Sequence, residues 1–592
     1  MTVLAVALAG CGVPDAGGPV AEGAPEQIAG NDKGKPEVTP PVPQEAVDSR
    51  QAAELYFEAA SSEWAALPEQ VGKFVTPSAL EQLPRPAVRV TVVRDLEFSA
   101  PDVRSPDEHR IEVHGEVIGE LAENGVLHPQ RRAFAHTFTF RRYEYARESV
   151  WRASEPPPGY VLSVEALRER FEALPLYFGN HRRTRELVPD VRYLPKSIEW
   201  SKQRTLLVEW LIQGPALWLR GAADHGFPDG VKRRGNVFVQ PDGRVVVNLS
   251  SEAEGYDKDH LDLMFAQLSW TLRARARAGL EVRIENRPIK YRGSVTQHRD
   301  EFFEYNAVEA LPEAVGYMVT SGGRVVTVRA NNGKFPALPK VLTSRPAGVD
   351  HNTDVESVAV TRSERKVALV RAPEGGRDEL WIGRRSGEKV SYRRAAGLPA
   401  NDQLSEPVWV GAADPRSVLV AAGGELYEVD GRSARARRLE LPHELGAVTS
   451  IAIAPDGYRL ALVADGRLHV AAVERDQGLG VGDPYLVTMQ VSDTVDVAWS
   501  REDRVVAVGV GRSGEGLWEV RIDGVLAEPV DIPDTGALTR VAGRPDVVME
   551  VGRRGTVLIE QGDRLYEIFS ADFGAPGNTG TSPQGGNPAL QA

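Results

Sequence analysis

The chain has 592 residues, a formal net charge of −13 and a hydrophobic content of 42%. That length predicts several domains, about four at roughly 150 residues each, and the apolar content excludes wholesale disorder. The acidic balance, without a concentrated basic stripe, argues against a nucleic-acid partner. A single cysteine excludes a disulfide framework within the chain, and it excludes any structural zinc site that needs two or more cysteines.

The single cysteine, Cys11, follows a short apolar leader that has too few residues to span a bilayer. Leu8, Ala9 and Gly10 with Cys11 resemble a bacterial lipobox, in which the signal peptide is cut before the cysteine. The resemblance implies an S-diacylglycerol on the Cys11 thiol and an acyl group on its new amino terminus. Several fatty chains on one residue give stable anchoring to a membrane. A signal peptide also needs a basic start, and the first basic residue here is Lys33, so we expect the true start codon to lie upstream.

Two segments read as poorly structured. Residues 11–44 form the expected lipidated tether, because residues 12–44 hold seven Pro, six Gly and no aromatic residue. Residues 573–592 are rich in Gly, Pro, Ser and Asn and are expected to be a disordered tail. Between these segments the sequence predicts a multidomain protein, mainly β with α+β parts.

The first folded block is expected over residues 45–175. It begins with a helix for which Ser49 is the expected N-cap, and Phe74 to Pro77 break the helical pattern. Alternating strands follow at 88–93, 111–117 and 133–140, and the sheet ends after Trp151. A helix on a curved antiparallel sheet resembles the cone-shaped folds of the nuclear-transport-factor-2 type. His114 and His136 lie in these strands, and we interpret them as solvent-facing rather than catalytic.

The second block, residues 176–310, starts with a strand at 187–194 and a further apolar stretch at 206–212. A hairpin over 237–249 with its turn at Pro241 to Gly243, a helix through Leu261 to Leu272 and a strand at 282–284 complete it. This order of motifs resembles the GerMN domain of spore-germination and other cell-envelope proteins. The resemblance implies a binding or scaffolding module, and no catalytic residue can be carried over from it.

The third block, residues 315–572, contains a repeat. Similar short strands begin at Ser357, Pro407, Ser450, Asp496 and Arg540, in steps of 50, 43, 46 and 44 residues. Periods near 45 with about four short strands per unit predict a β-propeller, and a β-sandwich is the alternative. Ala454 to Gly457 match the turn of TolB-like propeller repeats. Strands at 316–319 and 325–328 could add a further blade, so the repeat allows five to seven blades.

No known catalytic or metal motif is complete in this sequence, so neither a catalytic residue, a metal site nor a cofactor is predicted. Gly478 to Gly482 are interpreted as a propeller loop rather than a phosphate cradle. Asp257 and Asp259, with His260 and Asp262 nearby, could mimic a calcium cluster. The cluster lacks EF-hand spacing and opens a helix, so helix capping is preferred.

The complete order of lipobox, tether, sheet-rich block, GerMN domain and propeller resembles the LpqB family of actinobacterial lipoproteins. Residues 187–284, and the step from Leu176 into Leu187, carry this resemblance most specifically. It implies a lipid-anchored protein on the extracytoplasmic face of the cell membrane. It also implies contact with the extracytoplasmic part of the sensor histidine kinase MtrB, and modulation of signalling in cell-envelope homeostasis and division. The alternatives are an envelope enzyme built on the propeller and a passive binder of cell-wall glycan.

Overall fold

In the computed structural model, residues 40–590 are described apart from 85–88, 146–147, 182–183, 273–277, 307–314, 321, 330–336, 339–352, 375, 387–388, 401–402, 412–414, 477, 532–537, 545–555, 562–563 and 570–584. The chain divides into two compact units, Met1–Glu37 and Val38–Ala592, and every described residue belongs to the second. Within the described ranges, no helix is both long and apolar enough to cross a membrane.

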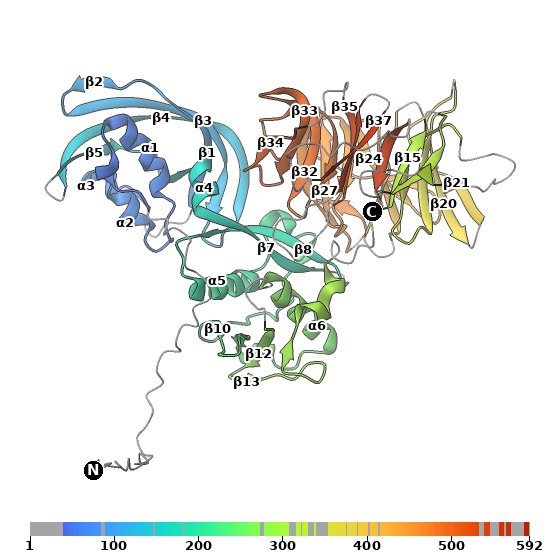
Figure 1. Cartoon of the computed structure of the whole chain (residues 1–592), viewed down its shortest axis with the longest axis horizontal. Helices are drawn as coiled ribbons and strands as arrows, with labels where there is room; N and C mark the ends of the chain where they lie inside the picture. The colour runs from blue at the N-terminus through green and yellow to red at the C-terminus, as the bar shows by residue number, and fades with distance from the viewer. Residues whose placement is uncertain are drawn as a thin grey trace, which may run out of the picture. The chain divides into compact units, whose positions relative to one another are not determined.

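The N-terminal block packs helices against one face of a curved sheet (Figure 1). Its strands lie in the order β5-β4-β3-β1-β6, with β2 paired to β3, and β1 and β6 run parallel. The bounds of its elements are α1 Ser49–Ala59, α2 Leu67–Gly72, α3 Pro77–Leu80, β1 Arg89–Phe98, β2 Asp102–Ser105, β3 Glu108–Ala122, β4 Leu127–Tyr145, β5 Glu148–Glu155, β6 Tyr160–Ser163 and α4 Val164–Arg170. This is the α+β layer that the sequence predicts.

Helix α1 lies on the sheet because its apolar residues recur at helical spacing. Phe57 and Tyr56 are buried and pack edge-on against Phe138 of β4, with ring centroids 5.7 and 5.2 Å apart. The prediction of Ser49 as N-cap was wrong by one residue. Asp48 caps the helix, since its carboxylate accepts a hydrogen bond of 2.8 Å from the backbone N–H of Gln51.

Among its described residues, the middle block contains two small sheets and two α-helices. Its elements are β7 Phe171–Asn180, β8 Leu187–Pro195, α5 Trp200–Gln213, η2 Leu217–Leu219, β9 Ala223–Asp224, β10 Phe238–Val239, β11 Val245–Leu249, η3 Ser251–Ala253, α6 Lys258–Thr271, β12 Leu280–Ile284, β13 Arg287–Pro288, β14 Thr296–Gln297 and η5 Arg299–Tyr305. Strands β11 and β12 pair in parallel with α6 between them in sequence. The predicted hairpin, the helix after it and the closing strand are therefore present.

Helix α5 contains the apolar stretch at 206–212. It ends at Gly214, whose φ of 92° is a conformation that glycine adopts without strain. The β7–β8 hairpin joins two hydrophobic cores: Phe171 and Tyr193 pack in the core of the N-terminal block, whereas Leu176 and Leu194 pack in the core of the middle block. The boundary expected at 175/176 therefore falls inside one continuous strand.

The described residues of the third block form six sheets, which we number as blades I to VI. In chain order they are β17-β16-β15-β38, β18 to β21, β22 to β25, β26 to β28 with β29 and β30, β31 to β34, and β35 to β37. The strands of blades I to III are β15 Val315–Thr320, β16 Val325–Arg329, β17 Ala337–Leu338, β18 Val355–Val360, β19 Lys366–Arg371, β20 Glu379–Ser386, β21 Lys389–Arg394, β22 Val408–Val410, β23 Ser417–Ala422, β24 Glu425–Asp430 and β25 Ala436–Arg438. Those of blades IV to VI are β26 Val448–Ile453, β27 Arg459–Ala464, β28 Arg467–Glu474, β29 Gly480–Val481, β30 Tyr485–Leu486, β31 Ser492–Trp499, β32 Arg504–Gly511, β33 Gly514–Arg521, β34 Ala527–Pro529, β35 Leu538–Arg544, β36 Thr556–Gln561 and β37 Arg564–Phe569; β38 spans Gly585–Leu590.

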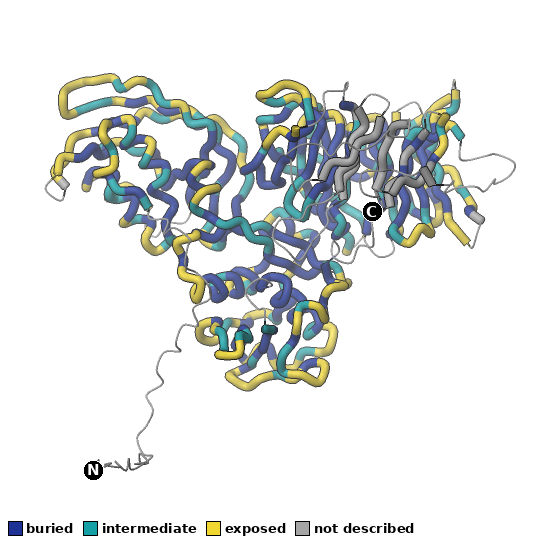
Figure 2. The backbone as a smooth tube through the Cα atoms, viewed as in Figure 1, coloured by how far each residue is buried: buried dark blue, intermediate teal, exposed yellow. Residues whose placement is uncertain are grey.

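The first strands of blades II to VI follow one another in a ring, and β38 closes that ring between β35 and β18. The fold is therefore a β-propeller and not a β-sandwich, and its described residues form six blades where the sequence allowed five to seven. Figure 2 shows that most of its described strands are buried along their middles.

The prediction of a disordered tail over 573–592 was wrong for Gly585–Leu590, which form β38 and pair antiparallel with β15. Its register slips between Tyr317 and Val319, next to Pro588, which has no N–H to donate to the ladder. A carboxyl-terminal strand that completes the blade begun by β15 ties the two ends of the propeller together. The remainder of the expected tail, residues 573–584 and 591–592, lies outside the described residues.

Candidate functional site at the junction of the three blocks

The predicted lipidation site lies outside the described residues. Leu8, Ala9, Gly10 and Cys11 all belong to residues 1–39, so their role stays a prediction. His114 is exposed on β3, and His136 of β4 is partly exposed, with its Nε2 3.0 Å from the carbonyl oxygen of Glu155. These positions agree with the interpretation of both histidines as solvent-facing strand residues.

The acidic cluster at the start of α6 acts in capping, as expected. The Asp257 carboxylate accepts a hydrogen bond of 2.9 Å from the backbone N–H of His260. The same carboxylate lies 2.7 Å from the Nδ1 atom of the His260 ring. Asp262 is buried and pairs with Arg292 at 3.0 Å instead of facing the other acids. Over the described ranges, no three His, Cys, Asp or Glu side chains are grouped so that they could hold a metal ion.

The glycine-rich segment Gly478 to Gly482 runs along the edge of blade IV. Gly480 and Val481 form β29, which pairs with β28. This placement agrees with a propeller loop.

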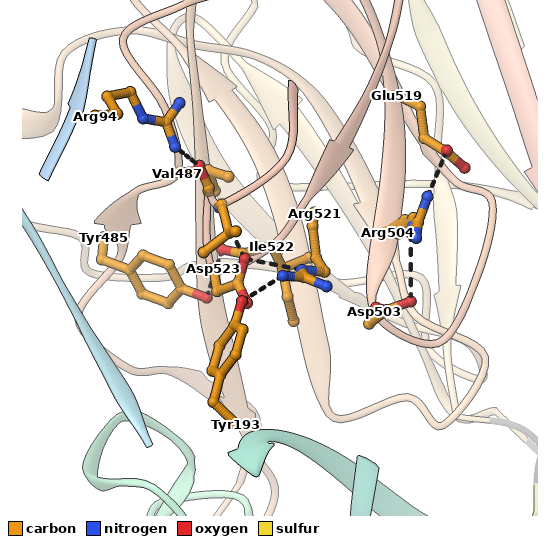
Figure 3. A network of polar contacts seen from close by, with 12 residues as sticks. Arg94, Tyr193, Tyr485, Val487, Asp503, Arg504, Glu519, Arg521, Ile522 and Asp523 are labelled. Carbon is orange, nitrogen blue, oxygen red and sulfur yellow. Dashed lines mark hydrogen bonds and ion pairs between the residues drawn. The ribbon is translucent and has the colours of Figure 1, made fainter. Parts of the chain in front are cut away.

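The most developed polar network lies where blade V meets the other two blocks (Figure 3). Asp523, in the turn between β33 and β34, is its centre. Its carboxylate accepts a hydrogen bond of 2.5 Å from the Tyr193 hydroxyl of β8, and it pairs with Arg521 at 3.2 Å. The Arg521 guanidinium also donates to the Tyr193 hydroxyl. The Asp523 carboxylate holds its own turn closed as well, since it accepts from the backbone N–H of Val525 at 2.9 Å.

Two arginines of the N-terminal block complete this junction. Arg94 of β1 donates to the backbone carbonyl of Gly524, and Arg131 of β4 donates to the carbonyls of Val487 and Asp523. Burial lowers the pKa of Arg94, and it lowers the pKa of Arg131 to about 10. Both guanidinium groups therefore pay a desolvation cost, which their hydrogen bonds to the propeller backbone offset in part.

Glu116 of β3 lies beside these two arginines. Burial raises the pKa of its carboxyl group, while the charges of Arg94 and Arg131 act in the opposite direction. No described residue forms a hydrogen bond with its buried Oε1. Nearby, Arg512 forms an ion pair of 2.5 Å with Asp95, and the Arg512 side chain is exposed to solvent.

A second contact joins the middle block to the propeller. Glu502, between β31 and β32, accepts hydrogen bonds from the Tyr177 hydroxyl at 2.6 Å and from the Asn306 amide at 2.8 Å. Trp218 of η2 packs edge-on against Tyr485 of β30, with ring centroids 5.3 Å apart. The core of the middle block also includes Tyr458 and Ala472 of the propeller.

The turn of blade IV that matches the TolB-like repeat supports this second contact from within the propeller. Asp456 pairs with the buried Arg459 at 2.6 Å, and the Arg459 guanidinium lies 4.8 Å above the Trp499 ring. Arg459 also donates to the backbone carbonyl of Glu502. The turn therefore fixes the position of the carboxylate that the middle block binds.

The inner strands of the propeller carry a smaller polar cluster. Arg540 of blade VI pairs at 3.2 Å with Glu406, which precedes β22 of blade III, the blade opposite in the ring. Asp496 of blade V is buried and links its neighbours, because it accepts from Ser450 at 2.6 Å and from the Val541 N–H at 2.8 Å. These carboxylates tie blades to one another.

The junction joins the three blocks through buried polar contacts. Burial and the neighbouring Asp523 carboxylate raise the pKa of Tyr193 well above its usual value, so this phenol stays protonated at neutral pH. The Asp523 carboxylate is engaged by three donors. Sequence reasoning missed this site, although charged residues inside apolar runs, such as Arg94 after Val92 and Val93, are a signal for it.

Three family models match the chain. They are described as "Lipoprotein LpqB, N-terminal domain" at residues 43–168, "Sporulation and spore germination" at 175–290, and "Lipoprotein LpqB beta-propeller domain" at 337–567. Two solved structures are distantly similar to this chain. The Cps50 (Swd1) β-propeller domain of Myceliophteria thermophila is 13% identical with a TM-score of 0.29, and the match covers 44% of this chain and 97% of that domain. A nidogen/laminin complex is 8% identical with a TM-score of 0.33, and the match covers 47% of this chain and 98% of the matched chain.

Curated relatives match over most of the length. A protein named "Lipoprotein LpqB" from Mycobacterium tuberculosis is 24% identical over 77% of this chain and 78% of its own. A protein of the same name from Rhodococcus opacus is 24% identical over 81% of this chain and 81% of its own. Another from Streptomyces coelicolor is 26% identical over 64% of this chain and 65% of its own. With all three folded blocks matched in order, the chain belongs to the LpqB family of actinobacterial lipoproteins.

Proposed function

We propose that this chain is a lipid-anchored accessory protein on the extracytoplasmic face of the cell membrane. In this role it binds the extracytoplasmic part of a sensor histidine kinase of the MtrB type and modulates its signalling in cell-envelope homeostasis and division. The observation that carries the proposal is the family membership over all three folded blocks.

The lipobox at Leu8 to Cys11 supports the anchored location. A lipid on Cys11 confines the chain to a thin layer at the membrane. Confinement raises its effective concentration toward membrane-embedded partners without any new contact. An accessory protein with a modest intrinsic affinity for a kinase would therefore still be bound to it.

The polar sites of the described residues support binding over catalysis. At the junction, Asp523 is engaged by Tyr193, Arg521 and Val525, and on the inner strands Asp496 is engaged by Ser450 and Val541. Such carboxylates orient other groups and are not placed as an acid and base pair around an open substrate position. The junction instead fixes the three blocks against one another. Such rigidity suits a protein that acts by presenting a binding surface to a partner.

The test is crosslinking in membranes. The full chain is expressed behind a complete signal peptide in an actinobacterial host that lacks its own copy, and crosslinked peptides are identified by mass spectrometry. We expect peptides from the extracytoplasmic part of one sensor kinase to be crosslinked to this chain. The Cys11→Ala variant should lose lipid label and lose these crosslinks from membranes. The same purified variant should still bind the isolated kinase ectodomain, because the lipid contributes no contact to the kinase.

Capture of no sensor kinase, together with turnover of a wall fragment by the pure protein, would overturn the proposal in favour of an envelope enzyme. Capture of wall glycan alone would favour the passive glycan binder. Membrane retention of Cys11→Ala equal to that of the native chain would contradict the anchor.

A further inference from the structure

Arg94 and Glu116 are cross-strand neighbours on the outer face of the N-terminal sheet. The register places them directly opposite each other in the β1–β3 pair, so their side chains leave the same face. Opposite charges in that arrangement attract each other across the two strands. The Arg94 Nη2 atom nevertheless donates to the backbone carbonyl of Gly524 in the propeller (Figure 3). The propeller therefore holds the cation that Glu116 would otherwise bind.

The Glu116 carboxyl group is left without a donor. Its Oε1 atom is buried and has no hydrogen-bond partner among the described residues, and the same is true of the Arg94 Nε atom. The second nearby guanidinium group, that of Arg131, donates to the carbonyls of Val487 and Asp523 in the propeller. An ionised carboxylate at this position loses hydration and gains no hydrogen bond in exchange, which costs free energy. The neutral acid avoids most of that cost.

Few other contacts reinforce this docking. Val525 is the propeller residue that enters the core of the N-terminal block. At the edges, exposed ion pairs join Asp95 to Arg512 and Arg168 to Glu528, with arginine side chains that are 71% and 50% exposed. Ion pairs as exposed as these add little to stability. The docked state therefore depends strongly on the two buried guanidinium groups.

The tip of the docked turn fits only because it has no side chain. Gly524 has a φ of 77°, and a Cβ atom at this position would overlap the Arg131 guanidinium group and the Val487 carbonyl. A methyl group at Gly524 would therefore displace Arg131 from its acceptors. The variant Gly524→Ala provides a chain whose turn cannot be seated on the sheet.

Charged and titratable groups face Glu116 from each element packed against it. They are Arg94 and Asp95 of β1, Arg131 of β4 and Arg512 of blade V, with His114 two residues along the same face of β3. Asp523, Tyr485 and Glu165 lie around the two buried arginines. Burial raises the pKa of Glu116 although both arginines act against this shift. That direction agrees with a carboxyl group that releases its proton less readily while the propeller is docked.

We propose that the contact between the N-terminal block and blade V is a proton-controlled latch with Glu116 as its sensor. While Glu116 carries a proton, Arg94 is available to hold the carbonyl of Gly524. When that proton passes to the solvent, the carboxylate attracts Arg94 back across the β1–β3 pair, and the docked turn loses its donor. One arginine is thus shared between two acceptors, and the proton decides between them.

The sign of the response follows from proton linkage. In the open state Glu116 faces water, where a glutamate has a pKa of about 4.3. The docked state binds the proton more tightly, so docking is complete below that value and weakens as the pH rises through the docked value. A single proton changes the ratio of open to docked chains by at most about tenfold per pH unit.

Opening would uncover the outer face of the N-terminal sheet around Arg94 and Arg131. The middle block would keep its own contact with the propeller through Glu502 and Trp218, so the propeller would stay attached. The latch would therefore control which surface is offered to a partner. In that consequence it rests on the proposed function, whereas its test does not.

The test measures the distance between two spin labels on the full chain. The sequence has a single cysteine, so Cys11→Ser removes it, and Thr137→Cys with Glu515→Cys supply exposed sites on the sheet and on blade V. Pulsed electron paramagnetic resonance gives the distances at about pH 5 and about pH 8, at constant salt, which bracket a raised glutamate pKa. We expect one short distance at the lower pH and an added population of longer distances at the higher pH.

Glu116→Gln should stay docked at both pH values, because the amide does not ionise. It should lower the open-to-docked ratio about tenfold for each pH unit above the docked pKa. The matched control is Glu112→Gln, an exposed carboxylate four residues along the same face, and it should respond as the parent chain does. His114→Asn should also leave the response unchanged. Gly524→Ala should show the longer distances at both pH values.

The proposal would be overturned by label distances that do not change with pH in the parent chain while Gly524→Ala is open. A pH response that Glu112→Gln or His114→Asn removes, or that Glu116→Gln retains, would contradict it equally. If circular dichroism shows that Glu116→Gln does not fold, Glu116→Ala replaces it with the same expectation. No kinase is present in this experiment, so its failure leaves the crosslinking test of the proposed function unaffected.

Discussion

The propeller is held by its two neighbours in physically different ways. The middle block contributes large apolar surfaces, with Trp218 against Tyr485 and the propeller residues Tyr458 and Ala472 inside its own core. The N-terminal block contributes mainly buried charge, through Arg94 and Arg131. Val525 is the propeller residue that enters the core of the N-terminal block.

This difference determines what each contact responds to. Apolar burial is nearly independent of pH and salt and depends on contact area. A buried guanidinium, by contrast, is stabilised only while each donor keeps its acceptor, and removal of one partner leaves an uncompensated charge. The contact with the N-terminal block is therefore the more sensitive of the two to the loss of a single polar partner and to a change of protonation.

The largest expected effect comes from Asp523→Ala. The substitution leaves Tyr193 and Arg521 buried without their acceptor, and breaking a buried pair costs about 3 kcal/mol or more. Native-state hydrogen exchange at β33 and β34 should report this loss as easier local opening. Arg168→Gln, which removes an exposed ion pair with Glu528 on β34, is the control and should cost less than about 0.5 kcal/mol. Similar values for both would refute the distinction between buried and exposed charge.

Trp218→Ala tests the apolar contact. Removal of a partly buried indole should cost about 2 kcal/mol, because apolar area is exposed and a cavity is left. Limited proteolysis should then cut between the middle block and the propeller more quickly, at a rate that does not change between low and high salt. A strong salt dependence would contradict the apolar character of this contact.

Tyr177→Phe removes one hydrogen bond from the same contact. The Glu502 carboxylate keeps the Asn306 amide as a donor, so we expect a loss of about 1 kcal/mol. A double-mutant cycle with Glu502→Gln measures the coupling between the two side chains. Additive losses would show that this hydrogen bond contributes nothing to the contact.

Glu116→Gln should change the pH dependence of stability. Burial raises the pKa of Glu116 in the folded chain, so its stabilising contribution is complete below the unfolded value of about 4.3 and is lost as the pH rises through the folded value. Its charged neighbours are Arg94, Arg131, Asp95 and Arg512. Relative to the native chain, the variant should gain stability as the pH rises through this window in thermal unfolding. A constant difference across the window would contradict the assignment.

Much of the local structure could be predicted from the sequence. The helix over Lys258–Thr271 follows from its apolar period and from Asp257 as cap, and the repeat of about 45 residues indicates the propeller. The N-cap of α1 was misplaced by one residue because Asp48 and Ser49 are both good caps. The apolar stretch at 206–212 was recognised, but its helical state follows from packing.

The sequence by itself determined the blocks, their order and the lipobox prediction at Cys11, because periodicity, capping and motif spacing are properties of neighbouring residues. Only the tertiary structure decided how the propeller closes, since Gly585–Leu590 has a weak strand propensity and pairs with β15 from across the whole block. It likewise decided the junction, where Tyr193 and Asp523 meet over a separation of 330 residues.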